Sequence, residues 1–119
     1  MSHETKLLET IETRIYTIRG QKVILDSDLA GLCGVETKQL NRQVKRNVSR
    51  FPVDFMFQLT SDEFKLLKCQ IGTSKEGRGG KHKLPYVFTE NGVAMLSSVL
   101  NSEQAITVNI AIMRIFTKL

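Results

Sequence analysis

The sequence predicts a small α+β fold, a single domain in which short strands are surrounded by about five helices. Its 119 residues match the length of one domain. Residues 14–25 carry two short runs of alternating and β-branched side chains around a glycine, which is typical of a β-hairpin. Several later segments begin with a capping side chain and continue with apolar residues at helical spacing.

The N-terminal part of the chain is expected to form a tail, a hairpin and a helix in that order. Residues 1–13 lean acidic and are assigned to the tail. The hairpin follows over residues 14–25, with its turn around Gly20-Gln21. Asp26 is a good N-cap, so a helix should begin there. Gly34 should end that helix, because glycine accepts a positive φ at low cost.

Helix-turn-helix geometry is expected next, with a second helix running from about Glu36 to Val48. Two helices joined by a tight turn at a large angle must approach closely, and Ala30 is small where they would cross. Leu40 and Val44 lie one turn apart on the second helix, so we expect them to pack against the first.

The second half of the chain alternates strands with capped helices. Thr60 and Glu63 have the spacing of a capping box, in which each residue bonds to the other at a helix start. The expected elements are strands near 55–59 and 84–88, a helix from Thr60 to about Ile71, a helix capped by Thr89, and a last helix opened by Asn101 and Ser102.

The last helix is apolar around most of its circumference, which is typical of a buried helix. Its apolar side chains form two stripes, one of Ile106, Ile110 and Met113 and the other of Val108, Ile112, Ile115 and Leu119. A domain core normally covers one side of a helix, so the second stripe needs another surface. That surface comes either from this chain or from a second copy, and a homodimer is one of these two open alternatives.

Basic residues are concentrated in two windows of a chain whose formal net charge is +5. Residues 37–53 hold five cations and no acid. Residues 77–89 hold three cations and no acid, with Lys75 just before them. Such asymmetry favours a polyanionic partner, although a solvated basic face is the alternative.

The outward face of the second helix is the candidate contact for nucleic acid. On a wheel of about 100° per residue, Arg42 and Arg46 lie opposite Leu40 and Val44. Arginine bonds guanine or phosphate bidentately, glutamine reads adenine and lysine favours phosphate. The basic, glycine-rich segment 72–83 would add contacts to the DNA backbone. The candidate DNA-binding residues are Lys38, Gln39, Arg42, Lys45, Arg46, Arg50, Lys75, Arg78, Lys81 and Lys83.

Membrane, secreted, metal-binding and catalytic classes are not expected. The sequence has no run of about 18 apolar residues to span a membrane and no secretion signal, which indicates a cytoplasmic protein. Its two cysteines, Cys33 and Cys69, are far apart, and its two histidines have no metal-ligand spacing, so we expect no metal site and no cofactor. No catalytic residue is identified, because Cys33 fits a helix core and no nucleophile elbow is present.

A resemblance to a known family is carried by the runs VILDSDLAGLCGVETKQLNRQVKRNVSRFPVDFMFQLTSDEF and LPYVFTENGVAMLSSVLNSEQAITVNIAIMRIF. Together they resemble the ORF-six-N (open-reading-frame-six N-terminal) domain, which is related to the KilA-N and BRO-N domains of phages and large DNA viruses. The most specific blocks are Arg46-Asn47, Arg50-Phe51-Pro52, Asp54-Phe55-Met56-Phe57 and Phe88-Thr89-Glu90-Asn91-Gly92.

This resemblance covers residues 14–119 and implies the N-terminal DNA-binding module of a longer phage or prophage regulatory protein. Such a module is antirepressor-like and acts on double-stranded DNA in the bacterial host. Two other functions stay open. One is a protein-interaction module that binds a repressor through the apolar C-terminal helix. The other is a nuclease or DNA-modifying enzyme, against which the lack of a carboxylate cluster argues.

Overall fold

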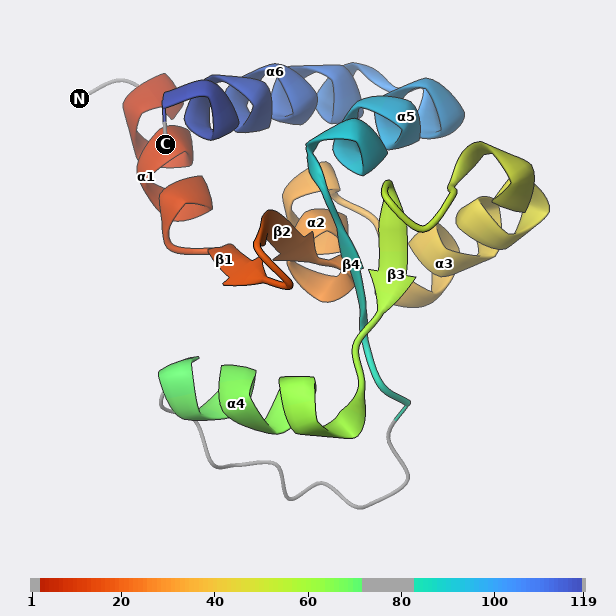
Figure 1. Ribbon diagram of the computed structural model, residues 1–119. Helices are drawn as coiled ribbons and strands as arrows, with labels where there is room; N and C mark the ends of the chain where they lie inside the picture. Colours follow the sequence, from red (N-terminus) through yellow and green to blue (C-terminus); the bar gives the residue numbers. More distant parts are fainter. Residues whose placement is uncertain (1–2, 72–82, 119) are drawn as a thin grey trace.

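The computed structural model describes residues 3–71 and 83–118 and confirms the predicted α+β class (Figure 1). The strands of this described part form one antiparallel sheet in the order β1-β2-β4-β3. In chain order the elements are α1 (His3–Glu12), β1 (Ile15–Ile18), β2 (Gln21–Leu25), α2 (Asp26–Cys33), α3 (Thr37–Arg46), a 3₁₀ turn (Val48–Arg50), β3 (Met56–Gln58), α4 (Ser61–Ile71), β4 (Tyr86–Phe88), α5 (Glu90–Leu100) and α6 (Glu103–Lys118).

The two central strands, β2 and β4, bury side chains on both faces of the sheet. Ile24 and Phe88 point into the larger core, which the helices α2, α3, α5 and α6 share. Val23 and Val87 point the other way, into a smaller core that includes Leu67 of α4. Successive residues of a strand face opposite sides, so both faces need cover. Figure 1 shows α4 on one side of the sheet and α5 and α6 on the other.

The hairpin forms where the sequence predicts it, but its turn lies one residue earlier. Ile18 pairs with Gln21, which leaves Arg19 and Gly20 as the two turn residues. Both have a positive φ, 56° and 75°. This is the geometry that matches the twist of a two-residue hairpin.

Residues 3–12, which the sequence assigned to a tail, form the helix α1. Leu7, Leu8 and Ile11 lie on one face of it, and Ile11 is fully buried. That face packs against α6, where Ile112 and Ile115 belong to the same core. An acidic segment therefore becomes ordered because its apolar stripe is covered.

Asp26 does not cap α2, contrary to the expectation. Leu25 occupies the N-cap position and makes no side-chain cap bond. Asp26 is the first helical residue and is buried, and its carboxylate accepts hydrogen bonds from the backbone N–H groups of Ser27 (2.7 Å) and Tyr86 (3.3 Å). Gly34 ends α2 as predicted, with φ at 74°.

The other predicted helix starts are confirmed by their hydrogen bonds. Thr60 Oγ1 accepts from the N–H of Glu63 (3.1 Å), and Glu63 Oε1 accepts from the N–H of Thr60 (2.8 Å), which completes the capping box. Thr89 Oγ1 accepts from the N–H of Gly92 (3.4 Å) at the start of α5. At the start of α6, Ser102 Oγ accepts from the N–H of Ala105 (3.1 Å).

Helix α6 is buried along one stripe only. Its composition had suggested a helix that is buried around most of its circumference. Ile112 and Ile115 are buried against α1, α2 and α5. Ile106 and Ile110 of the other stripe are 47% and 46% exposed. The surrounding helices cover one side of α6. No helix in residues 3–71 and 83–118 is long and apolar enough to cross a bilayer.

Candidate nucleic-acid interface

Helix α3 lies at one edge of the molecule (Figure 1). Leu40 and Val44 are buried in the larger core together with Leu29 and Ala30 of α2. The turn between the two helices is tight, because the N–H of Val35 already bonds to the carbonyl of Ala30 (3.0 Å). This packing leaves the opposite face of α3 toward solvent.

A hydrogen bond to a residue of α2 holds α3 in its orientation. Asn41 Nδ2 donates to the buried carboxylate of Asp26 (3.1 Å), whose same oxygen accepts from the N–H of Tyr86 in β4. At the other end, Asn47 Nδ2 donates to the carbonyl of Gln43 (2.9 Å). The Asn41 bond therefore ties α3 to α2 and β4, whereas the Asn47 bond closes the C-terminal turn of α3 itself. The sequence analysis did not identify Asn41 as a positioning residue. The feature that could have indicated this role is a polar amide at the boundary between the buried Leu40 and the exposed Arg42.

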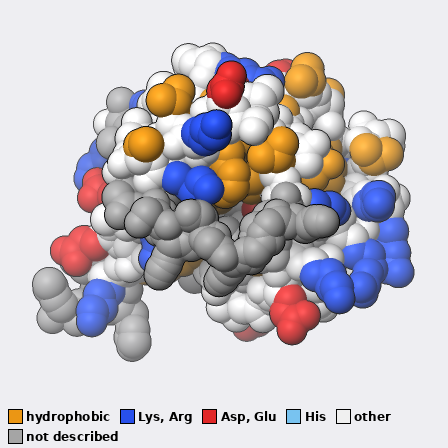
Figure 2. Space-filling model, turned by 90° about the horizontal axis from the view of Figure 1, so that it is seen from below, with side chains coloured by type: hydrophobic (Ala, Val, Ile, Leu, Met, Phe, Trp, Pro, Cys, Tyr) orange, Lys and Arg blue, Asp and Glu red, His pale blue; other side chains and the backbone are white. Residues whose placement is uncertain are grey.

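The outward face of α3 is basic and exposed. Lys38, Gln39, Arg42, Lys45 and Arg46 are all exposed, and so is Arg50 in the 3₁₀ turn that follows. Neither of the two ion pairs found within the described ranges involves any of them. Figure 2 shows Lys and Arg side chains gathered on the side of the molecule where α3 lies. We call these six residues the α3 basic face.

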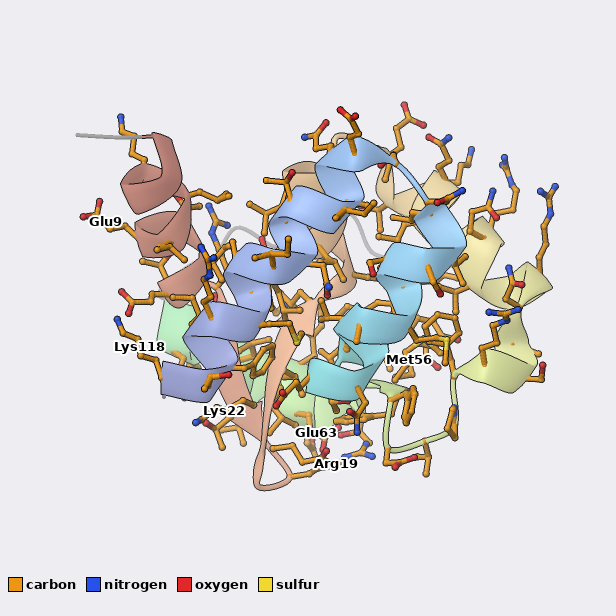
Figure 3. All side chains as sticks on the ribbon, turned by 90° about the horizontal axis from the view of Figure 1, so that it is seen from above. Glu9, Arg19, Lys22, Met56, Glu63 and Lys118 are labelled. Carbon is orange, nitrogen blue, oxygen red and sulfur yellow. The ribbon has the colours of Figure 1, made fainter. Side chains whose placement is uncertain are left out.

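The two arginines of the N-terminal hairpin contrast with the α3 basic face. Arg14 Nη1 lies 2.9 Å from Asp28 Oδ1, which joins β1 to α2. Arg19 Nε lies 2.8 Å from Glu63 Oε2, and its guanidinium stacks 4.1 Å from the ring centre of Phe57 (Figure 3). These cations are paired with acids of the chain and serve its structure. The cations of the α3 basic face take part in neither of the two ion pairs found among the described residues.

In the comparison with known families, the model of the ORF6N domain matches residues 13–99. This chain belongs to the ORF6N domain family. The family is of phage type. Comparison with curated proteins and with solved structures found no match.

The ORF6N match contains all four described strands and both helices α2 and α3, whereas α1 and α6 lie outside it. One of its specific blocks, Phe88 to Gly92, has a structural explanation. Thr89 caps α5, and its N–H and hydroxyl both bond to the carbonyl of Phe55 (3.0 and 3.3 Å). A Cβ on Gly92 would overlap that same carbonyl. The block therefore joins α5 to β3.

The glycine-rich segment of this ORF6N domain contributes one residue that the structure describes. Lys83 is exposed and lies on the segment that leads into β4, apart in sequence from α3 and the 3₁₀ turn. Lys75, Arg78 and Lys81 lie outside the described residues. The structure therefore brings together the six residues of the α3 basic face and does not place Lys83 among them.

Other reactive groups of the ORF6N domain lie away from this face. Cys33 is buried in the larger core, and burial raises the pKa of its thiol. Within the described part of the chain, no group of three or more His, Cys, Asp or Glu side chains is arranged to hold a metal ion.

Proposed function

We propose that this ORF6N domain binds double-stranded DNA through the α3 basic face. The observation that carries the proposal is a rigidly anchored helix whose exposed cations have no acidic partner among the described residues. Between Thr37 and Val53 the sequence holds no acid at all. An ordinary solvated helix face carries charges of both signs, so a face of one sign favours a polyanion.

The chemistry of the α3 basic face suits both parts of a duplex. Arg42 and Arg46 lie one helical turn apart, and each can form bidentate hydrogen bonds with a guanine edge or a phosphate. Gln39 can read adenine, and Lys38 and Lys45 suit phosphates. A single α-helix fits the major groove of B-form DNA, which is how the second helix of a helix-turn-helix pair docks. The proposed binding includes no reaction on the DNA.

We further propose a regulatory, antirepressor-like role in the cytoplasm of a bacterial host, which the phage-type family supports. The basic residues of the glycine-rich segment, with Lys83 beside them, would add backbone contacts to those of α3. Such contacts position a protein on DNA without reading its sequence.

Binding to a random-sequence duplex at two salt concentrations tests the proposal. Phosphate contacts release counterions, so affinity should fall steeply as salt rises. The double variant Arg42→Ala/Arg46→Ala should melt like the wild type and lose about 1–3 kcal/mol of binding free energy for each base-reading arginine. The matched control is Lys6→Ala/Lys118→Ala, which removes the same charge from exposed positions on α1 and α6. Figure 3 shows Lys118 on the far side of the molecule from α3.

Two results would contradict DNA binding through this face. One is a wild type that does not bind the duplex at low salt. The other is an arginine variant that binds as tightly as the lysine control does.

The half-exposed stripe of α6 favours a second candidate, the docking of another protein. Ile106 and Ile110 are 47% and 46% exposed, more than a core helix of this composition should leave. The partner would be a repressor or a second copy of the chain. Apolar docking depends little on salt, and Ile106→Ser/Ile110→Ser should abolish it while sparing DNA binding. Sedimentation of both forms at micromolar concentration tests the homodimer.

A further inference from the structure

The segment that joins α3 to β3 exposes two valines. Val48 and Val53 are 62% and 72% exposed. Five large apolar side chains are exposed in the described part of the chain, and two of them lie in this one short segment. Isolated exposed apolar residues are common, but these two both lie in the short connection that follows the basic helix α3, Val48 in the 3₁₀ turn and Val53 in the loop after it. We call this pair the valine patch.

The valine patch is held rigidly, because its neighbours are pinned on both sides. Phe51, between the two valines, is buried and meets the ring of Phe88 edge-on, with 6.0 Å between ring centres. The carbonyl of Pro52 accepts from the N–H of Phe55 (2.7 Å). The carbonyl of Asp54 accepts from the hydroxyl of Thr89 (2.8 Å). An anchored backbone therefore presents the valines to solvent, so they are not the side chains of a frayed loop.

The charges around the valine patch indicate what it contacts. Val48 lies between Arg46 and Arg50, both of which are exposed, whereas Val53 is followed directly by the exposed Asp54, the first acid after Glu36. Apolar side chains near cations can bind a ligand in which apolar groups are flanked by negatively charged groups. The major groove of DNA is such a ligand, because each thymine places a C5-methyl group there between two phosphate backbones.

We infer that Val48 and Val53 contact thymine methyl groups in the major groove beside α3, an inference that rests on the proposed DNA binding. The segment continues directly from α3, so it would enter the same groove. Wedges that unstack base pairs from the minor groove use longer or flat side chains such as Phe, Leu, Ile, Met and Pro. The short, branched side chain of valine reaches a neighbouring methyl group better than the space between two bases.

Uracil provides the test, because it differs from thymine by the loss of the C5-methyl group and leaves the backbone charge unchanged. An alternating adenine–thymine DNA duplex offers a methyl group at every base pair. The matching DNA duplex, with deoxyuridine in place of thymidine, offers none. The wild type should bind the thymine duplex about fifteenfold more tightly, which is the product of about fourfold for each of the two valine–methyl contacts. Val48→Ser/Val53→Ser should bind both duplexes alike, at the level of the wild type on uracil, with an unchanged salt dependence.

The control variant is Leu66→Ser, which removes an apolar side chain that is 70% exposed on α4. It should keep the full preference for thymine. The comparison of the wild type on the two duplexes needs no variant, so it tests the contact even if a serine variant unfolds.

Each other outcome overturns a defined part of the reasoning. Equal wild-type affinity for both duplexes, with affinity still lost in Arg42→Ala/Arg46→Ala, refutes the methyl contact and leaves DNA binding intact. Equal weakening of both duplexes by the valine variant places the patch against sugars and refutes the thymine assignment. Failure of the wild type to bind either duplex refutes the proposed function itself.

Discussion

Gly92→Ala should destabilise this domain far more than a glycine-to-alanine change in a helix normally does. Gly92 is the third residue of α5, where the helix passes over the backbone that leads into β3. A Cβ built on Gly92 lies 2.9 Å from the carbonyl carbon of Phe55, closer still to its oxygen, and 3.4 Å from Cβ of Phe88. The carbonyl cannot simply retreat, because it accepts hydrogen bonds from the N–H (3.0 Å) and the hydroxyl (3.3 Å) of Thr89.

The expected loss follows from three contributions. Forcing an extra carbon into a packed site costs about 1–3 kcal/mol. Weakening the two bonds to the Phe55 carbonyl costs about 1 kcal/mol each. Alanine returns up to about 1 kcal/mol because it is the better helix former. The net effect is a loss of about 2–4 kcal/mol, or a fall in Tm of roughly 8–16 °C for a domain of this length.

Thermal melting followed by circular dichroism measures this loss, with Gly31→Ala as the matched control. Gly31 lies within α2, and nothing is within 4 Å of a Cβ built there. Gly31→Ala should therefore raise the stability by about 0.4–1 kcal/mol. The reasoning is refuted if Gly92→Ala melts at or above the wild-type temperature while Gly31→Ala behaves as expected.

Three further predictions concern groups that the fold pairs or buries. Asp26→Ala should cost about 2–4 kcal/mol in urea denaturation, because it leaves partly buried donors of three elements without their shared acceptor; a loss below about 1 kcal/mol would contradict this. Hydrogen bonds from Arg19 lower the pKa of Glu63 from 4.5 to about 2, so its contribution is complete above pH 4.5 and disappears as the pH falls to about 2. Glu63→Gln should flatten that part of the stability–pH curve by no more than about 1 kcal/mol, as measured by melting across this range, and an unchanged curve would count against the pairing. In the native protein an alkylating reagent should label the exposed Cys69 and spare the buried Cys33, which mass spectrometry would show; rapid labelling of Cys33 before unfolding would contradict its burial.

Much of the local structure could be predicted because it depends on residues a few positions apart. The capping box of Thr60 and Glu63 and the cap at Thr89 each join groups within one helical turn. Gly34 ends α2 for a reason confined to its own backbone. The wheel likewise identified Leu40 and Val44 as the buried side of α3, because helical periodicity is enough to separate two faces.

Interactions between distant segments decided the rest. Asp26 looks like a helix cap in the sequence, but its carboxylate instead joins α3 to β4, whose Tyr86 is 60 residues away. Residues 3–12 lean acidic, yet they fold as a helix because α6 covers Ile11. Of the two apolar stripes on α6, composition could not say which one the neighbouring helices would bury.

The candidate interface shows the same division. The sequence by itself determined that α3 has a basic side, since charge and helical spacing are properties of the chain. Only the tertiary structure decided that Asn41 anchors this helix and that Val48 and Val53 stand exposed beside it. Valine is usually a core residue, but in this segment Phe51 takes the buried position against Phe88, and the two valines on either side of it stay exposed.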